Sequence, residues 1–375
     1  MKADPRGAVE LSEAVGRESM VDKLWSNLRE GSVLLQGRAG LGKTTLVRLA
    51  IADAPTGWRG RRVGVSELRG AGALANAMVE ALVAEHPDPG PRLRAAIEAA
   101  DASGKRISEP IFVLHEAIAA ELADRAGGLL FALDDVDRFI EANLDRSLEL
   151  AELIATLDEL VREQPRLRLL FVSNTRLGRA IEHMRPRPPR QLLADHRLIT
   201  MPALSPESGA RLAAMLLLGE SITARDRAGL ARKIADALDH VPLWIHALVV
   251  EFAKKRGAIG DGRLDEVLAR IVGDPGDPWG LRADLSPVLH GYAEPSRRIA
   301  LSLLDRIATA GPEGLTFTDL HRELAIETTL DADAVRRVLD ELRADQICEE
   351  LGGTLRFCAT LLRRSWVAMR KLDPR

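Results

Sequence analysis

The sequence has little cysteine, few aromatic residues and no long apolar run. Its two cysteines, Cys348 and Cys358, are too few for a disulfide framework, which favours a reducing compartment. The longest uncharged apolar runs, Leu129 to Leu133 and Ala213 to Leu218, are far shorter than the roughly 20 residues that span a bilayer. The first residues also contain no apolar segment of the kind found in signal peptides. These absences predict a cytoplasmic protein with no membrane partner.

An excess of charge of one sign is missing too. The 52 Lys and Arg residues face 55 Asp and Glu residues, so the net charge is −3 and no overall positive field attracts nucleic acid. Aromatic residues make up only 3% of the sequence, so alanine and aliphatic side chains must build the core, which favours helices. With 375 residues, 46% apolar and 29% charged, the composition is typical of a folded chain of two or three domains.

Short apolar segments alternate with helical patterns in the first 200 residues. Strands are predicted at Ser32 to Gln36, Arg61 to Ser66, Leu129 to Leu133, Leu167 to Ser173 and Arg197 to Met201. Strands separated by helices form parallel sheets that are covered on both faces. The fold class is therefore α/β, with a five-stranded parallel sheet between two layers of helices.

The strand pattern stops after Pro202. Residues 205–272 show several helical segments, and Gly273 to Gly280 is rich in helix-breaking residues. The last 90 residues predict three helices and then a hairpin around Gly352-Gly353, the order of a winged helix. We expect a nucleotide-binding domain at 1–203, a helical lid at 204–280 and a winged-helix domain at 281–375.

A glycine-rich segment follows the first predicted strand. Residues 37–44, GRAGLGKT, match G-x-x-x-x-G-K-[ST], with the strand before it and the helix after it that this motif requires. Glycines let backbone N–H groups approach phosphate, Lys43 brings a positive charge to the β- and γ-phosphates, and Thr44 offers a hydroxyl to Mg²⁺. The alternative is a glycine-rich turn that happens to carry Lys-Thr. The predicted nucleotide-binding residues of this loop are Gly37, Gly40, Leu41, Gly42, Lys43, Thr44 and Thr45.

Two acidic residues end the strand that begins at Leu129. Ligands of parallel sheets bind beyond the carboxyl ends of the strands, so Asp134 and Asp135 are placed for a nucleotide site. We expect Asp134 to hold Mg²⁺ through water and Asp135 to orient or deprotonate the attacking water. An acidic pair at this point also suits a helix cap, and we assign Asp137 that role and no catalytic one.

Polar residues also follow the strand that ends at Ser173. Asn174 is predicted to contact the γ-phosphate or the attacking water, and Arg176 to reach phosphate or a neighbouring subunit. The alternative is a polar turn that closes a strand. Lys43, Asp135 and Asn174 thus form the predicted catalytic set, and Thr44 and Asp134 the predicted metal set.

Together these motifs resemble the AAA+/STAND group of P-loop ATPases of the ASCE type. The chain most resembles the archaeal-type and origin-recognition-like branch, which ends in a winged helix. The segments AVGRE, at Ala14 to Glu18, and LDHVPL, at Leu238 to Leu243, are similar to the family's N-terminal and lid motifs. The resemblance implies that Val15, Gly16 and Pro242 lie near adenine, although all three also suit ordinary turns.

Two positions depart from the family pattern. His240 stands where the lid motif usually has glycine, which affects the local backbone. Asp135 stands where many members have the longer glutamate, and a shorter carboxylate fits slow turnover.

The resemblance implies a slow ATPase that acts as a switch. Its ATP or ADP state, with Mg²⁺, would control lid orientation, self-assembly and engagement of DNA or a partner across the nucleotide face. The alternative is a nucleotide-gated regulatory subunit that recruits a separate effector protein without contacting DNA. A small-molecule kinase is disfavoured, because the last 170 residues are typical of a lid and a winged helix.

Two segments are candidates for DNA contact, each with an alternative. One is the winged helix, although residues 295–375 hold 13 basic and 13 acidic side chains, a weak charge footprint for phosphate binding. The other is the arginine-rich segment Arg185 to Arg190, which prolines keep extended. Docking of a protein by the winged helix and a solvated loop at Arg185 to Arg190 are the alternatives.

Overall fold

The computed structural model divides into two compact units. The sheet unit holds residues Arg17–Gly37 and Lys43–Met201, and the helical unit holds Met1–Gly16, Arg38–Gly42 and Pro202–Arg375. The residues described are 1–5, 9–84, 95, 109–124, 126–174, 177, 181, 184, 196–254, 259, 262–286, 292–325 and 331–373.

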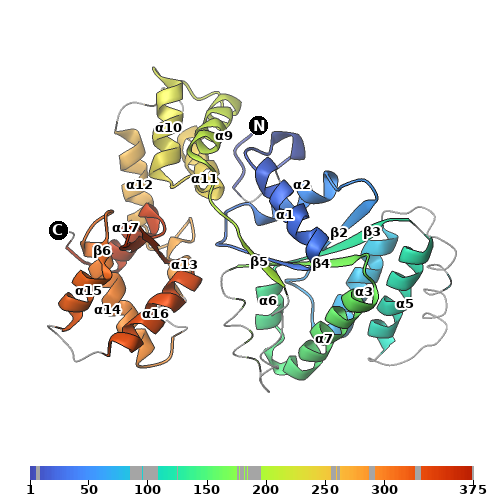
Figure 1. Cartoon of the computed structure of the whole chain (residues 1–375). Helices are drawn as coiled ribbons and strands as arrows, with labels where there is room; N and C mark the ends of the chain where they lie inside the picture. The colour runs from blue at the N-terminus through green and yellow to red at the C-terminus, as the bar shows by residue number, and fades with distance from the viewer. Residues whose placement is uncertain are drawn as a thin grey trace. The chain divides into compact units, whose positions relative to one another are not determined.

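The sheet unit is built on five parallel strands in the order β2-β3-β4-β1-β5 (Figure 1). The strands are β1 (Val33–Gln36), β2 (Trp58–Gly64), β3 (Gly128–Asp134), β4 (Leu167–Ser173) and β5 (Arg197–Thr200). All seven residues of β3 are buried, as expected of a central strand that is covered on both faces. The predicted five-stranded parallel α/β sheet is confirmed.

Strand β2 begins at Trp58, three residues before the predicted start. The sequence there is WRGR, which does not look like a buried strand. Two contacts accommodate its first residues: Trp58 lies against Gly128 of β3, where a Cβ would approach its ring to 2.6 Å, and Arg59 lies 3.3 Å from the buried Glu121. The charge of Arg59 is thus compensated inside the unit.

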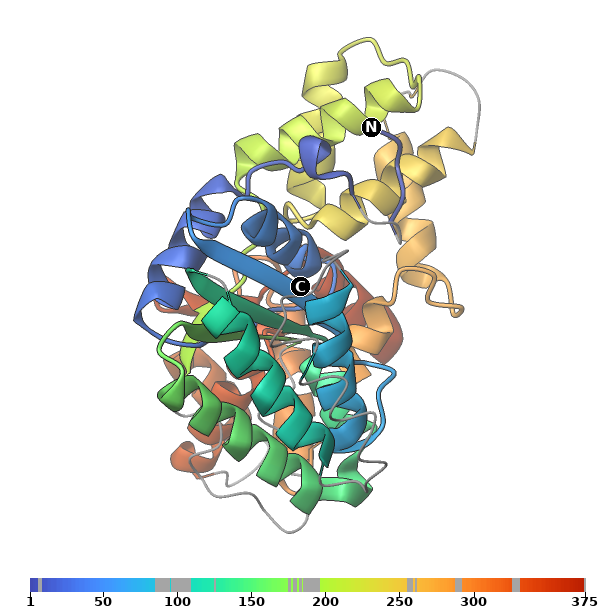
Figure 2. The ribbon, with the colours of Figure 1, turned by 90° about the vertical axis from the view of Figure 1, so that its right-hand side faces the viewer.

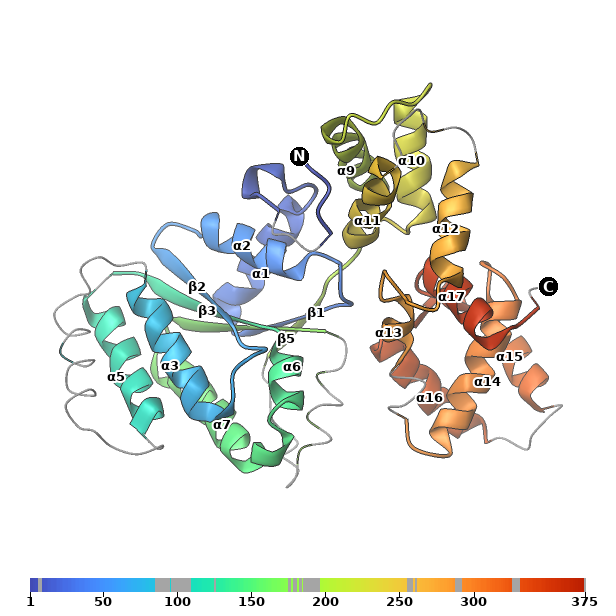
Figure 3. The ribbon, with the colours of Figure 1, turned by 180° about the vertical axis from the view of Figure 1, so that it is seen from behind.

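Helices cover both faces of this sheet (Figures 1 and 3). One face carries α1 (Glu18–Glu30) and α2 (Lys43–Ala52). The other carries α3 (Gly70–Val83), α5 (Glu109–Asp124), α6 (Val136–Glu141) and α7 (Ser147–Glu163), with the short η2 (Leu144–Arg146) before α7. The main core lies between the sheet and this second layer, and its buried side chains are mostly Leu, Ile, Val and Ala. The helix expected after the acidic run is α6, which begins at Val136, one residue before Asp137.

The helical unit contains a group of packed helices, coloured from yellow-green to orange in Figure 2. They are α9 (Pro206–Gly219), α10 (Arg227–Ala237), α11 (Pro242–Ala253) and α12 (Arg263–Gly273). Side chains at the N-terminal ends fix where two of them begin: Ser205 accepts from the Ser208 N–H, and Asp226 from the Gly229 N–H.

The first residues of the chain pack on these helices. The Ala3 N–H donates to Glu220 Oε1 at 2.8 Å, and the Asp4 N–H donates to His246 Nδ1 at 3.2 Å. The short η1 (Leu11–Glu13) follows before Gly16. This segment therefore belongs to the helical unit and not to the sheet unit.

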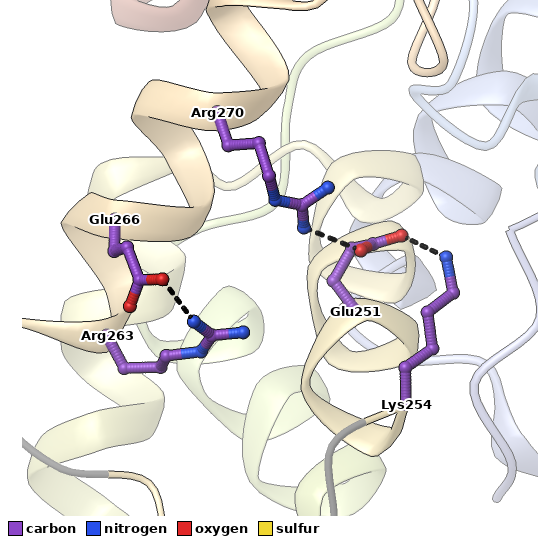
Figure 4. A network of polar contacts seen from close by, with 5 residues as sticks. All are labelled: Glu251, Lys254, Arg263, Glu266 and Arg270. Atoms are coloured by element: carbon purple, nitrogen blue, oxygen red, sulfur yellow. Dashed lines mark hydrogen bonds and ion pairs between the residues drawn. The ribbon is translucent and has the colours of Figure 1, made fainter.

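An ion-pair network ties α11 to α12. The Glu251 carboxylate lies between Lys254, the residue that follows α11, and Arg270 on α12, at 2.8 Å from the latter (Figure 4). Within α12, Arg263 pairs with Glu266 at 2.6 Å. Burial opposes ionisation of Glu251, but the hydrogen bonds from Lys254 and Arg270 outweigh burial and lower its pKa.

The C-terminal part of the helical unit has the winged-helix arrangement. Its elements are α13 (Leu281–Ser286), α14 (Ser296–Thr309), β6 (Leu315–Thr316), α15 (Phe317–Ala325), α16 (Ala332–Ala344), β7 (Cys348–Leu351), β8 (Thr354–Phe357) and α17 (Thr360–Arg370). The strands form an antiparallel sheet in the order β6-β8-β7. Gly352 and Gly353, with φ of 60° and 80°, make the tight turn of the predicted hairpin.

Three of these elements were not predicted: α13, β6 and α17. Helix α17 buries Trp366 completely, which makes it part of the core. Both cysteines are free thiols, and burial raises the pKa of Cys348 to about 12 and that of Cys358 to about 11. Among the described residues, no helix combines the length and apolarity that a bilayer span requires.

Candidate nucleotide site

The glycine-rich loop joins β1 to α2, and Lys43 is the first residue of that helix. The Lys43 side chain is buried, and its Nζ donates to the Gly37 carbonyl at 2.7 Å and to Asn174 Oδ1 at 2.9 Å. These partners meet because β1 and β4 are neighbours: Gln36 is paired with Ser173, and the Gly37 N–H donates to the Ser173 carbonyl. The ammonium group therefore lies at the carboxyl ends of two adjacent strands.

A second polar residue holds Asn174 in place. The backbone N–H of Asn174 donates to Asp137 Oδ1, and its Nδ2 donates to Asp137 Oδ2, both at 3.0 Å. The Asp137 side chain is buried in the first turn of α6. Asp137 is thus a positioning residue that sequence reasoning missed, although its place in the run DDVD could have suggested more than a cap.

The predicted metal pair is brought together. Thr44 Oγ1 donates to Asp134 Oδ2 at 2.9 Å, and the Asp134 carboxylate is buried at the end of β3. The same oxygen accepts a hydrogen bond from Arg62 Nε, at 2.9 Å, which the sequence did not indicate. A hydroxyl and a carboxylate oxygen form a hard donor set of the kind that Mg²⁺ prefers, so these residues fit that ion together with phosphate oxygens.

Asp135 has the left-handed backbone conformation, with φ of 68°, at the start of α6. Although it takes the N-cap position, its side chain makes no capping hydrogen bond, which argues against the role of a simple cap. Burial raises its pKa, and the neighbouring Asp134 raises it further. The carboxylate is half-buried at the same end of the sheet as Lys43.

The middle of the glycine-rich loop, residues 38–42, belongs to the helical unit. Gly40 and Gly42 have φ of 81° and 87°, a conformation that side chains disfavour. A Cβ on Gly40 would lie 2.6 Å from Leu243 Cβ, and the Leu243 N–H donates to the Gly40 carbonyl at 3.2 Å. Leu41 is buried, whereas Thr45 of α2, in the sheet unit, is half-exposed.

The residues expected on the adenine side also lie in the helical unit. Val15 is buried, and Gly16 packs so closely on α9 that a Cβ would lie 2.2 Å from Ser208 Oγ. Pro242 is the first residue of α11. His240 has φ of 57°, so it adopts the left-handed conformation that the family's glycine would favour.

Two predicted regions cannot be placed. Arg176 and the segment Arg185 to Arg190 lie outside the described residues, so their roles stay predictions. Within the described ranges, no cluster of three or more His, Cys, Asp or Glu side chains could hold a metal ion alone. A metal ion would therefore rely on Thr44, Asp134 and oxygens from the nucleotide.

Part of the chain matches a known protein family. Residues 13–172 match the family of AAA ATPase domains. These residues include α1, the glycine-rich loop and all but the last residue of β4. No curated protein sequence matches the chain significantly.

Comparison with solved structures extends to nearly the whole chain. A Walker-type ATPase of Pyrococcus abyssi is 14% identical, with a TM-score of 0.67 over 98% of this chain and 99% of its own. The ORC2 protein of Aeropyrum pernix, in its ADPNP–ADP complexes, is 13% identical with a TM-score of 0.56 over 95% of both chains. The ADP form of the same protein gives 14% identity and a TM-score of 0.50, over 97% of this chain and 95% of that one.

At such identities the structural matches show the fold, and the family match shows the kind of domain. Residues 13–172 match the AAA ATPase domain, and the chain has the fold of the Walker-type ATPase of Pyrococcus abyssi and of the ORC2 protein of Aeropyrum pernix.

Proposed function

We propose that the protein is an ATP-binding, slowly hydrolysing switch. The observation that carries this proposal is the convergence of Lys43, Thr44, Asp134 and Asn174 at one end of the sheet. Lys43 would bind the β- and γ-phosphates, and the glycine-rich loop would surround them with backbone N–H groups. Thr44 and Asp134 would hold Mg²⁺, which neutralises charge that develops on the phosphates.

Asp135 would position and deprotonate the attacking water. Its raised pKa brings it closer to the range in which a carboxylate accepts a proton efficiently, and its side chain is free of capping bonds. The carboxylate of aspartate is one methylene shorter than that of glutamate, so it holds the water less closely. This shorter reach supports slow turnover, which suits a switch better than a motor.

The contacts of the glycine-rich loop support control of the lid and the winged helix. Leu243 at the start of α11 donates to Gly40, and the Arg38 N–H donates to Gln346 Oε1 in the winged helix at 3.1 Å. The Arg38 guanidinium also lies over the Trp244 ring, 5.2 Å from its centroid. A nucleotide that binds this loop would favour whichever lid and winged-helix positions suit the occupied loop.

The lid is in turn joined to the winged helix through Asp239. This residue precedes His240 in the lid motif, and its carboxylate accepts from Thr360 N at 2.7 Å and from Thr360 Oγ1 at 3.0 Å. Thr360 begins α17, so a lid carboxylate satisfies an N–H donor at the N-terminal end of a winged-helix element. A change in the lid motif would therefore reach the winged helix directly.

The charges of α16 favour a protein as the partner that this switch engages. Arg336 pairs with Asp333 at 3.1 Å, and Arg343 lies 3.4 Å from Glu350 of the wing. On the wing itself, Arg356 pairs with Glu349 at 2.8 Å. Cations that are already paired with carboxylates release few counterions on meeting DNA, which weakens backbone binding. The second candidate, a DNA-acting ATPase, rests on Arg185 to Arg190 and on the fold.

ATP turnover with and without duplex DNA, over a salt series, tests both candidates. The Lys43→Ala variant serves as the blank. We expect a low rate that depends on Lys43 and is the same with and without DNA. Stimulation by DNA that fades as salt rises would favour the second candidate. A rate equal to that of Lys43→Ala would overturn the proposed ATPase.

A further inference from the structure

Arg62 is the charged residue of the site that neither the motifs nor the proposed roles explain. It lies on β2, and its Nε donates to Asp134 Oδ2 at 2.9 Å. The Asp134 side chain is only 2% exposed, whereas that of Arg62 is 39% exposed. A buried carboxylate needs a cationic partner to offset the loss of its hydration, and Arg62 supplies one.

The register of the sheet explains how Arg62 reaches this carboxylate. Arg62 is paired with Ala132, and Asp134 lies two residues further along β3, opposite Gly64. Residues two apart on a strand share a face, so the long arginine side chain runs along the sheet toward its carboxyl end. The preceding Arg61 is buried and donates to the Gly60 carbonyl, so the two arginines have different surroundings.

The shared oxygen has a further consequence. Asp134 Oδ2 accepts from Arg62 Nε and from Thr44 Oγ1, both at 2.9 Å. Thr44 and Asp134 are the two residues that would hold Mg²⁺ under the proposed function. A guanidinium and a divalent cation repel each other, and neither can approach the same buried oxygen closely while the other is there.

We propose that Arg62 competes with Mg²⁺ for Asp134, and so sets the Mg²⁺ concentration at which the nucleotide binds tightly. This inference rests on the proposed function. Arg62 is a positioning residue that holds the Asp134 carboxylate in its orientation, and the exposure of its side chain lets it withdraw. Nucleotide would then be retained strongly only when enough Mg²⁺ is present to displace the guanidinium.

The test is a Mg²⁺ titration of nucleotide binding, followed by the fluorescence of a labelled, non-hydrolysable ATP analogue. It compares the wild type with Arg62→Gln, and Arg69→Gln serves as a matched control because Arg69 is exposed in the same unit and donates to the Leu68 carbonyl. We expect the Mg²⁺ concentration at half-maximal nucleotide binding to be about threefold to tenfold lower in Arg62→Gln than in the wild type, as the loss of one charge-assisted hydrogen bond predicts. Arg69→Gln should keep the wild-type midpoint.

An unchanged or higher midpoint in Arg62→Gln, with nucleotide binding intact, would overturn the inference and leave the proposed function standing. Failure of the wild type to bind more analogue than Lys43→Ala would overturn both. Arg62→Lys guards against misfolding, because it keeps the charge and should have a midpoint between those of the wild type and Arg62→Gln. In an Asp134→Asn background, Arg62→Gln should cause no further shift, and a shift there would also contradict competition for Asp134.

Discussion

The carboxyl end of the sheet and helix α16 both carry many charges, but their environments differ. At the sheet, the side chains of Lys43, Asp134 and Asp137 are at most 8% exposed and have hydrogen-bond partners from other elements. On α16, Arg336 and Asp333 are 61% and 76% exposed and pair within one helix turn. Exposed pairs of this kind contribute little to stability and hold no fixed geometry.

This difference shows where the sequence carries functional information. Burial of a charged side chain costs free energy unless the charge has a partner. A group of buried charges at one end of the sheet therefore points to a ligand whose charges complement them. The exposed charges of α16 balance each other and point to no ligand. The geometry therefore supports a nucleotide site at the sheet, whereas it gives no such support to DNA binding by α16.

The largest expected loss is that of turnover in Asp135→Asn. The amide cannot accept a proton from water, so kcat should fall by about 10²–10⁴ while nucleotide affinity stays near that of the wild type. Single-turnover measurements with saturating enzyme separate the chemical step from binding. A single-turnover rate equal to that of the wild type would show that Asp135 is not the base.

The pH profile of the wild type sharpens this test. Burial and the nearby Asp134 raise the Asp135 pKa above its ordinary value of 3.8, and only the ionised form can accept a proton. Activity should therefore fall as the pH drops through the raised pKa, at a higher pH than for an ordinary aspartate. A rate that stays flat down to pH 4 would contradict this.

A smaller loss is expected from Asp137→Asn. The amide keeps the size of the side chain but has one acceptor for the two Asn174 donors, so Asn174 and with it Lys43 would lose their fixed positions. Misplacement of groups around the reacting phosphate should reduce kcat about tenfold. Asp145→Asn, at an exposed position of η2, is the control and should be neutral. Equal kcat values for Asp137→Asn and Asp145→Asn would show that Asp137 does not position the catalytic groups.

Thr360→Val tests a partly buried pair outside the nucleotide site. The substitution removes the hydroxyl that donates to Asp239 and leaves the N–H donor in place. Loss of one hydrogen bond to a carboxylate should lower the free energy of unfolding by about 1.5 kcal/mol, measured by urea denaturation. Thr309→Val, whose hydroxyl donates to the Arg306 carbonyl, should cost less. An equal loss in the free energy of unfolding for the two variants would mean that the hydrogen bond to Asp239 contributes no more than one to a backbone carbonyl.

The smallest effect is expected on α16. Arg336→Gln removes an exposed pair with Asp333 and should change the free energy of unfolding by about 0.5 kcal/mol or less. It should also leave ATP turnover unchanged, both with and without duplex DNA. A loss of DNA-dependent turnover in this variant would show that the α16 cations are functional and would break the comparison between the two regions.

The parts of the site that were predictable are contiguous in the sequence. The loop from Gly37 to Thr44 and the run at Asp134 each form a local pattern, and hydrophobic periodicity gave the five strands within a few residues. The partners of these motifs were not predictable in the same way. Arg62 and Asp137 reach the site through strand register and through the adjacency of β1, β3 and β4, which no single segment encodes.

Dependence on the assembled fold also explains why α17 and β6 of the winged helix were not predicted. Helix α17 is amphipathic but follows a hairpin that looked like the end of the domain, and β6 has only two residues. The hydrogen bond between Thr360 of α17 and Asp239 joins residues 121 positions apart in the sequence. Contacts at such separations depend on the assembled fold.

Equilibrium binding of ATP to the wild type and to Lys43→Ala tests the central claim most directly. Lys23→Ala, which removes an exposed lysine from α1, is the matched control. We expect Lys43→Ala to bind ATP at least about tenfold more weakly, since a buried charge-assisted contact to phosphate is lost, while Lys23→Ala binds like the wild type. Equal affinities for the wild type and Lys43→Ala would contradict the assignment of the nucleotide site.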